Sequence, residues 1–363
     1  RIGKPAIADV RGVNFRNIII NGDMSIAQRG TSATGLGNGD NGYHTCDRWE
    51  FRESGSPTWE FTQTQSTDVP TGQGFAKSLK MDCTTADASL ASNDLCRISQ
   101  KIEGQNVQYL KYGTSSAQST TISFWVRSNK TGNYNVSLYN NDQTRSIGNT
   151  YTINSADTWE KKTITFAGDT ASAFDNDNNT SLWIWWALAA GTDRVGGDSS
   201  SWGAHTDNRN AAGQTVNLAD STSNEWYVTG VQLEAGSQAS DFEFLPVDVN
   251  LERCFRYYQF WVDGDNKEIG TGHYYSGTSL RWVTSFYKPM RTVPSLDHTS
   301  GTNYYRFLRA GANDNFNGFT FNDTSTNQNF QLNQSSNVSG TAGHSGMLRT
   351  NNASAYLAFD AEL

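Results

Sequence analysis

The sequence predicts an all-β protein, and three observations support this fold class. Aromatic residues make up 12% of the 363 residues, beside 33 glycines and many Asn, Ser and Thr residues. Thr, Tyr, Trp and Phe favour strands, whereas Asn, Gly and Ser favour turns. Many segments alternate apolar and polar residues with the period of two that a strand requires, and only one segment has helical spacing.

The segment Asn224–Gly236, NEWYVTGVQLEAG, is the clearest strand. Strict alternation puts Trp226 and Val228 on one face and Val231 and Leu233 on the other. Both faces are then apolar, so we expect this strand inside a sandwich or lining a groove.

In chain order, Arg1–Arg16 is irregular, and we interpret it as a linker or an arm docked on a neighbouring subunit. Asn17–Gly30 predicts a buried strand, followed by a Gly-rich loop over 31–42. Thr121–Ser128 and Asn133–Asn140 alternate on either side of a short turn, so we expect them to pair as a hairpin. The remaining strands of this part are expected at 43–51, 57–63, 76–83, 96–103, 158–166 and 181–190.

A long polar loop, Gly191–Ser223, contains Trp202 and His205. Loops of this length inside a compact domain are usually functional or disordered.

The character of the chain changes at Pro246. Asp248–Phe260 has apolar residues at helical spacing after an Asp or Asn cap and predicts a connecting helix within residues 246–260. Strand patterns return from 261 to 363. We therefore expect two β domains, at 17–245 and 261–363.

The charge pattern excludes several classes of partner. The net charge is −8 and no dense run of Lys and Arg occurs, so we expect no nucleic-acid binding. The longest apolar run, Leu182–Ala190, is less than half of the ~20 residues that span a bilayer, so we expect no membrane insertion. No signal peptide is recognisable, and because the first residue is Arg1 rather than Met we expect an upstream segment.

The four cysteines, Cys46, Cys83, Cys96 and Cys254, lack the spacing of a zinc site. We expect them to be reduced, as in a product assembled in a cytosol. The alternative is that Cys83 and Cys96 face each other across a hairpin.

Several segments resemble a family of phage tail-fibre and receptor-binding proteins, especially those of marine and cyanobacterial phages. They are NIIINGDMSIAQRGTS, TISFWVRSNKTGNYNVSLYN, DTWEKKTITF, TGVQLEAGSQASDFE, LERCFRYYQF, KPMRTVPSL and LAFDAEL. The resemblance implies a jelly-roll β-sandwich like a carbohydrate-binding module over 17–245, then a short helix and a second antiparallel β-sandwich. It brings no catalytic motif with it.

The same resemblance implies a function and a location. It implies a homotrimeric component of the virion tail fibre, made in the host cytoplasm, that contacts other phage tail proteins and attaches the particle to host-surface polysaccharide. The alternatives are a tailspike depolymerase that cuts the polysaccharide it binds, and a purely structural tail or decoration protein.

Aromatic side chains are the candidate ligand-binding residues, because the apolar face of a pyranose stacks on an indole ring. In the strand at 181–190, Leu182, Ile184 and Trp186 form the more apolar face. Trp183 and Trp185 then form a platform on the other face, with Trp202 and Tyr227 as companions. Burial of these aromatics beneath loops or subunits is the alternative.

Asp175, Asp177 and Asn179 place oxygen atoms at alternate positions, as a calcium loop does. Thr180 stands where an EF-hand requires Gly, so a polar turn is the alternative to a structural calcium site. No other cofactor is expected.

Hydrolysis of a glycan needs two carboxylates across a cleft. Asp47 with Glu50, or Glu225 with Glu234, are the pairs to consider, but strand spacing alone defines no cleft. The histidines are scattered and have no catalytic motif around them, and His205 in the long loop is the one to test. We therefore expect that the protein is not an enzyme, with the tailspike depolymerase as the alternative.

Overall fold

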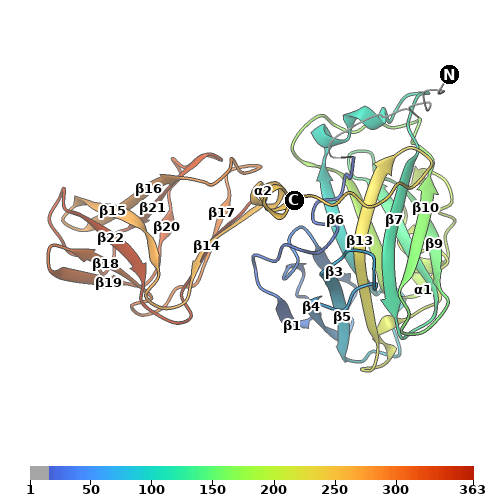
Figure 1. The fold of residues 1–363 in the computed structure, drawn as a ribbon, viewed down its shortest axis with the longest axis horizontal. Helices are drawn as coiled ribbons and strands as arrows, with labels where there is room; N and C mark the ends of the chain where they lie inside the picture. The colour runs from blue at the N-terminus through green and yellow to red at the C-terminus, as the bar shows by residue number, and fades with distance from the viewer. Residues whose placement is uncertain (1–15) are drawn as a thin grey trace, which may run out of the picture.

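The computed structural model describes residues 16–363 and confirms the all-β fold class (Figure 1). Two β-sandwich units are joined by helix α2 (Val247–Phe255), and every strand pair is antiparallel. The predicted arm 1–16 lies outside the described residues except for Arg16. None of the helices in the described part is long and apolar enough to cross a membrane.

The first unit is a jelly-roll sandwich of two sheets. The six-stranded sheet has the order β1 (Ser32–Leu36), β4 (Glu60–Ser66), β5 (Ser78–Thr85), β13 (Glu225–Ala235), β7 (Thr120–Ser128) and β10 (Glu160–Phe166). The seven-stranded sheet has the order β12 (Gly203–Ala204), β9 (Arg145–Ile153), β8 (Gly132–Asn140), β11 (Thr180–Ala190), β6 (Leu95–Glu103), β3 (Glu50–Ser54) and β2 (Gly42–Tyr43). The short helices are η1 (Gly104–Asn106), η2 (Gln108–Leu110), α1 (Thr192–Val195), η3 (Asp207–Arg209) and η4 (Leu218–Asp220).

A β-bulge corrects the predicted faces of β13. The register against β7 shifts between Thr229 and Gln232, and Gly230 has a φ of 61°. A bulge inserts one residue and reverses the alternation after it. Val231 and Leu233 therefore join Trp226 and Val228 in the same core. Glycine is needed at 230, because a Cβ there would lie 2.5 Å from the ring of Phe75.

The hairpin predicted from 121–128 and 133–140 is wrong. β7 pairs with β10 and β13 in one sheet, whereas β8 pairs with β9 and β11 in the other. The turn between them crosses from sheet to sheet, and Tyr134 Oη donates to the carbonyl oxygen of Lys130 across it at 2.8 Å. Alternation shows which face of a strand is apolar but not which strand lies beside it.

The strand predicted in Asn17–Gly30 is also wrong, although Ile18, Ile19 and Met24 are buried. Asn21 and Met24 have φ values of 57° and 60°, which end an extended strand. Side-chain amides take the place of ladder hydrogen bonds. Asn21 Nδ2, for example, donates to the carbonyl oxygens of Ile26 at 2.9 Å and Asp47 at 3.0 Å.

The second unit has one core between two sheets. The three-stranded sheet has the order β14 (Tyr258–Asp263), β23 (Tyr356–Asp360) and β17 (Ser295–His298). The seven-stranded sheet has the order β19 (Ala312–Phe316), β18 (Tyr305–Arg309), β22 (Ser345–Thr350), β15 (Glu268–Ser276), β16 (Ser279–Ser285), β21 (Asn329–Gln334) and β20 (Thr320–Phe321). Trp282, Phe330 and Phe359 meet in the core, with ring centroids 4.3 Å apart for Phe330 and Phe359.

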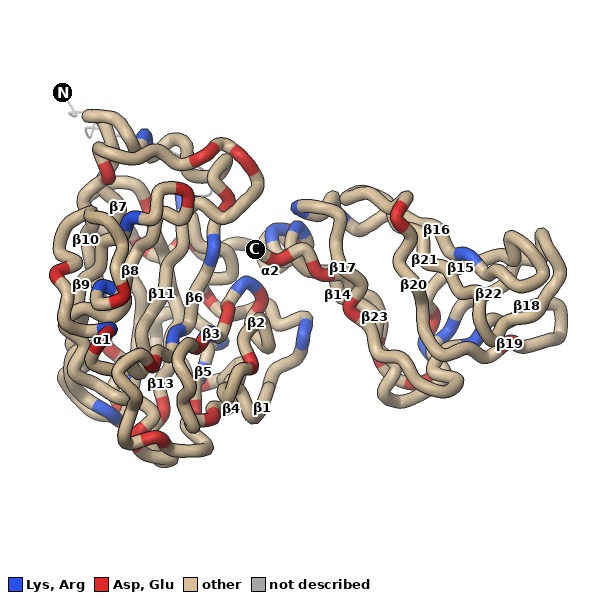
Figure 2. The backbone as a smooth tube through the Cα atoms, turned by 180° about the vertical axis from the view of Figure 1, so that it is seen from behind, with Lys and Arg blue, Asp and Glu red and all other residues tan. Residues whose placement is uncertain are grey.

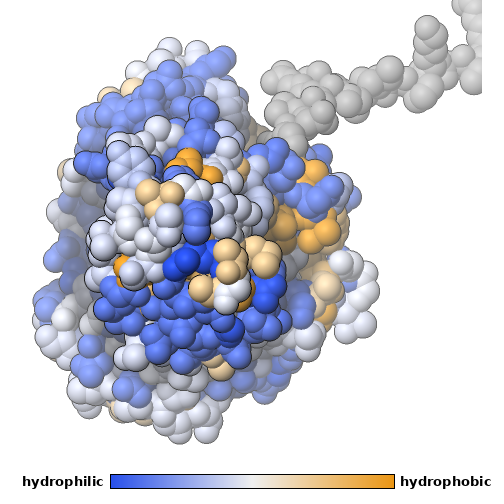
Figure 3. Space-filling model, turned by 90° about the vertical axis from the view of Figure 1, so that its left-hand side faces the viewer, coloured by the Kyte–Doolittle hydropathy of each residue, from blue (hydrophilic) through white to orange (hydrophobic). Residues whose placement is uncertain are grey.

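The face of the molecule drawn in Figure 3 is predominantly hydrophilic. The end of the second unit shows small apolar spots on a polar surface (Figure 3), and Tyr275, Val283 and Met347 are among its exposed apolar residues. Acidic and basic positions are scattered over both units (Figure 2).

Helix α2 is shorter than predicted. It ends at Phe255 rather than Phe260, and Tyr258 already belongs to β14. Pro246 precedes it without a side-chain capping bond. The pattern of apolar residues continues past the helix end because the next residues are buried as a strand instead.

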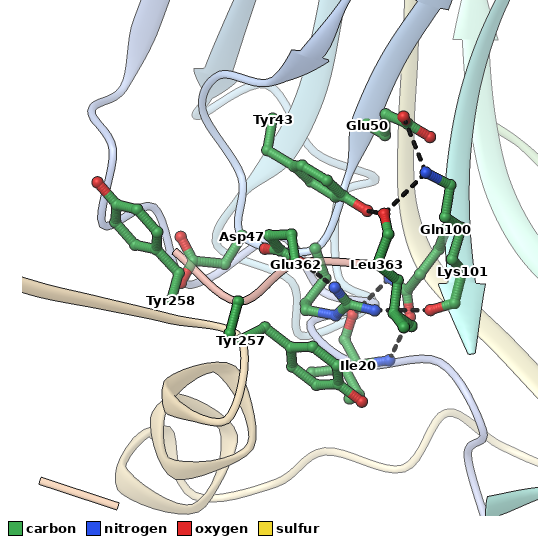
Figure 4. Close-up of polar contacts among 12 residues, drawn as sticks. Ile20, Tyr43, Asp47, Glu50, Gln100, Lys101, Tyr257, Tyr258, Glu362 and Leu363 are labelled. Carbon is green, nitrogen blue, oxygen red and sulfur yellow. Dashed lines mark hydrogen bonds and ion pairs between the residues drawn. The ribbon is translucent and has the colours of Figure 1, made fainter. Parts of the chain in front are cut away.

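The end of the described chain lies between the two units (Figure 1), and Figure 4 shows the polar contacts around it. The carbonyl oxygen of Leu363 accepts hydrogen bonds from Lys101 Nζ at 2.8 Å and Tyr43 Oη at 3.2 Å. Beside it, Arg48 forms an ion pair with Glu362, and both side chains are at least 95% buried. The Arg48 guanidinium also lies 3.5 Å from the centre of the Tyr257 ring.

A second ion pair links the units through Glu103. Burial by itself would raise the pKa of Glu103, but hydrogen bonds from Arg256 and Tyr257 lower it below its usual value. Arg256 Nε and Nη2 donate to the two carboxylate oxygens at 2.6 and 2.7 Å. Charged groups of the first unit are therefore satisfied by groups that follow α2.

We predict that Arg48→Met lowers the free energy of unfolding by about 3 kcal/mol, because it leaves the buried Glu362 carboxylate without its main partner. Urea denaturation followed by tryptophan fluorescence measures this. Lys288→Met is the control, because its partner Glu252 is 55% exposed and such a pair contributes at most ~1 kcal/mol. Equal losses in the two variants would contradict the importance of the buried pair.

Candidate functional site

A groove of about 330 Å³ lies on the outer face of the first unit's seven-stranded sheet. Strands β6, β8 and β11 form its floor, and the loop that carries α1 and η3 forms one wall. The alternation of β11 explains the floor. As predicted, Ile184 and Trp186 enter the core, so Trp183 and Trp185 point outward.

The floor of the groove is aromatic. The ring centroids of Trp183 and Trp185 are 5.6 Å apart, and that of Tyr139 lies 6.2 and 6.0 Å from them. Trp185 is 1% exposed, and its Nε1 donates to the carbonyl oxygen of Asn210 at 2.8 Å. Trp183 is half-buried, and its Nε1 has no hydrogen-bond partner.

A cation covers the two indoles. The Arg97 guanidinium lies 4.3 Å from the centre of the Trp183 ring and 4.9 Å from that of Trp185. Arg52 and Lys101 lie 5.4 and 5.2 Å from the Trp183 ring. The structure thus brings Trp183 and Trp185 together, but the surface offered to a ligand is aromatic and cationic rather than a bare indole platform.

The long loop is ordered by hydrogen bonds and an ion pair. Arg194 donates to the carbonyl oxygen of Asn93 through Nε at 3.0 Å and Nη2 at 2.8 Å, and Nη1 pairs with Asp207 at 2.9 Å. The backbone N–H of His205 donates to the carbonyl oxygen of Thr144 at 2.9 Å. The wall of the groove is therefore fixed to the edge of the sheet.

His205 faces the floor from this wall. Its ring centroid is 4.9 Å from that of Tyr139, and its Nδ1 is 3.0 Å from Ser146 Oγ. Burial, followed by the charge of Arg97, lowers the pKa of His205 to about 4. The imidazole is therefore neutral at physiological pH.

The other two aromatic candidates lie outside the groove. Trp202 packs edge-on against Tyr112 with ring centroids 5.7 Å apart, and its Nε1 donates to the carbonyl oxygen of Ala167 at 2.7 Å. Tyr227 belongs to the six-stranded sheet, where it is 5% exposed and packs near Trp159. Neither is a companion of Trp183, because the sandwich core separates Tyr227 from the groove and Trp202 braces the loop.

The predicted calcium ligands lie in the turn before β11. Both carboxylate oxygens of Asp177 accept hydrogen bonds from Asn179, one from its backbone N–H at 2.9 Å and one from its Nδ2 at 2.6 Å. Asn179 therefore turns its amide nitrogen, not its oxygen, toward Asp177. Asp175 lines the same surface hollow as Asp177 and Asn179. Within residues 16–363, however, no group of three or more His, Cys, Asp or Glu residues is placed to hold a metal ion.

The carboxylates considered for catalysis are engaged elsewhere. Asp47 accepts from the backbone N–H of Gln28 at 2.8 Å, and burial raises its pKa. Glu50 pairs with Lys101 at 3.1 Å. Glu225 and Glu234 lie on β13, in the opposite sheet.

A larger hollow of about 600 Å³ lies where α2 meets the first unit. Its charged groups include Arg256, which pairs with Glu103, and Lys288, which pairs with Glu252 at 3.0 Å. Arg256 and Lys288 thus have carboxylate partners already, and the floor of the hollow is aliphatic at Ile18. The smaller groove offers more unsatisfied polar and aromatic groups and is the better candidate.

The residues predicted from the sequence did not include three that line the groove, Arg97, Tyr139 and Arg194. A signal for Arg97 exists in LCRISQKIE, where Arg97, Ser99 and Lys101 alternate with Cys96, Ile98, Gln100 and Ile102 and so face outward from β6. Their position beside β11 is visible only in the structure, which pairs Lys101 with Trp183 and Arg97 with Ala187.

The four cysteines are all buried and form no disulfide bond. Cys83 and Cys96 lie in opposite sheets and do not face each other across a hairpin.

Neither a family model nor a curated protein matches this sequence. Among solved structures, the chain is similar to the enzymatically active domain of tailspike protein 4 of bacteriophage CBA120, with 12% identity over 61% of this chain and a TM-score of 0.32. The match spans only 22% of that tailspike chain.

Carbohydrate-binding modules are also similar. A family 4 module shows 13% identity over 59% of this chain and 97% of its own, with a TM-score of 0.30. The family 11 module of Clostridium thermocellum, in complex with a β-1,3-1,4-mixed-linked tetrasaccharide, shows 10% identity over 58% of this chain and 98% of its own, with a TM-score of 0.28. Identity at this level transfers no function.

We predict that His205 titrates near pH 4 in the folded protein, well below its ordinary value of about 6.5. The charges that face it are those of Arg97, Arg194, Arg209 and Asp207, with the Tyr139 hydroxyl also nearby. Between these pH values the unfolded chain binds the proton and the folded chain does not, so stability falls as pH drops from about 6.5 toward 4.

An NMR titration of the imidazole measures the pKa, with His205→Gln assigning the signal and His273→Gln as the control. In denaturation experiments, His205→Gln should lose less stability over this pH range than the unsubstituted protein. A titration near pH 6.5 would contradict the burial of the ring.

Proposed function

We propose that this protein is a glycan-binding attachment protein of a phage tail fibre and that the groove over β6, β8 and β11 is its binding site. The observation that carries the proposal is the convergence, on one outer sheet face, of Trp183 and Tyr139 with hydrogen-bonding groups from a fixed loop. Sugar recognition needs both an aromatic surface and polar groups at its edge.

The phage origin is supported by the resemblance of several segments to tail-fibre proteins, from NIIINGDMSIAQRGTS near the start of the chain to LAFDAEL at its end. The proposal includes a homotrimer on the virion. Several copies per particle would raise a modest affinity per site into stable attachment. It also includes domains at 17–245 and 261–363, because each range has its own core.

Binding without cleavage is the preferred form of this proposal. Asp207 is the single carboxylate among the described residues that line the groove, and it pairs with Arg194. A glycosidase of the usual kind needs two carboxyl groups flanking the bond. The depolymerase and the structural tail protein are the alternatives that the experiment must separate.

We predict that Trp183→Ala weakens binding to host-surface polysaccharide by about tenfold, the loss expected when an aromatic contact worth ~1.4 kcal/mol is removed. Co-sedimentation measures binding, and release of reducing ends is followed in the same tube. Trp159→Ala is the matched control, because Trp159 is a half-buried tryptophan near Tyr227 on the opposite sheet.

Three other outcomes would change the conclusion. Release of reducing ends would favour the depolymerase. Equal loss in the two tryptophan variants would move the site away from the groove. Absence of binding to polysaccharides from several hosts would favour a structural tail component.

A further inference from the structure

Arg97 is a cation without an ion-pair partner among residues 16–363. Its one polar contact is a long one, 3.5 Å from Nη1 to Asn210 Oδ1. Arg97 is half-buried, and charged groups removed from water are usually paired with an opposite charge. The groove therefore contains a positive charge that the described chain leaves uncompensated.

Neighbouring carboxylates are already shared among other cations. Glu50 lies 3.1 Å from Lys101 and 3.4 Å from Arg52, and Asp207 lies 2.9 Å from Arg194. Four cationic side chains in and beside the groove thus face two carboxylates, although the whole chain carries a net charge of −8. The local charge is opposite in sign to that of the protein.

The surroundings of Arg97 disfavour its charged form. Burial, followed by the charge of Arg52, lowers its pKa to about 9. The group is still protonated at neutral pH, but its charged form is poorly solvated. An anion beside Arg97 would offset both the cost of burying its charge and the repulsion from Arg52.

The two indoles hold Arg97 in place. A guanidinium stacked on aromatic rings is already ordered, so its N–H groups are free to bind a planar or tetrahedral anion at little entropic cost. The same stacking covers the ring faces that a neutral pyranose would use. Trp183 Nε1 is buried without a hydrogen-bond partner.

We propose that the groove selects an anionic glycan, with the carboxylate of a uronate or the sulfate of a sulfated sugar bound to Arg97 and the adjoining sugar ring on Tyr139 and the open part of Trp183. This inference rests on the proposed glycan-binding function and narrows its ligand class. The groove then recognises the charge of the sugar as well as its shape.

Affinity electrophoresis of the full chain tests the inference with two pairs of polymers. Polygalacturonate and its carboxyl-reduced form differ only in the carboxylate, and dextran sulfate and dextran differ only in the sulfate. We expect the acidic member of at least one pair to bind at least about tenfold more tightly than its neutral counterpart, as a charged hydrogen bond predicts. The pair that responds identifies the anion.

Arg97→Gln should weaken that binding by roughly tenfold or more, and Arg97→Lys should restore only part of it because ammonium lacks the planar fork. Lys161→Gln is the control, because it removes the same charge from an exposed position on β10 of the other sheet. Thermal unfolding and an NMR titration show whether each variant keeps the groove. In Arg97→Gln the pKa of His205 should rise, because the charge that lowers it is gone.

The outcomes distinguish selection of an anion from glycan binding itself. Equal losses in Arg97→Gln and Lys161→Gln, or equal affinity for acidic and neutral polymers, would overturn selection of an anion while leaving glycan binding intact. Absence of binding to both acidic polymers would also overturn it, and the host-polysaccharide experiment then decides separately whether the groove binds glycans.

Discussion

The packing of Trp186 between the two sheets is the contact on which the site depends. Its ring centroid lies 5.5 Å from that of Trp49, just before β3, and 5.6 Å from that of Phe124 on β7. Burial of this ring fixes which face of β11 points inward. Because successive side chains alternate, the same contact fixes Trp183 and Trp185 on the outer face. The groove is thus positioned by a core that it does not belong to.

The chemistry of the groove depends on the positive charge of Arg97, which the indole rings partly shield from water. Arg97 contacts two indoles, and its charge in turn helps to keep His205 neutral. Electrostatic interactions are stronger where water is partly excluded, so a single unpaired guanidinium dominates the site. The whole chain carries a net charge of −8, so the positive charge of the groove contrasts with that of the protein.

Charged side chains also lie at the junction between the two units, but there they form ion pairs. There the buried Arg48 and the partly exposed Arg256 pair with the buried carboxylates Glu362 and Glu103, and the charges are satisfied within the chain. Paired charges link the two sandwiches, whereas Arg97 has no ion-pair partner among residues 16–363. The comparison explains why the larger hollow at the junction is the weaker candidate for recognition.

Local patterns in the sequence predict the all-β class, the inner face of β11, the break at Pro246 and the helix that begins beside it, because each depends on local periodicity or backbone restriction. The other features depend on how distant segments pack together. The bulge at Gly230 reversed the faces of β13, and β7 and β8 parted into different sheets, because pairing depends on residues far along the chain. The groove joins Arg97, Tyr139 and Trp183 from three strands with His205 from a loop, and their proximity comes from sheet order, which no local pattern encodes.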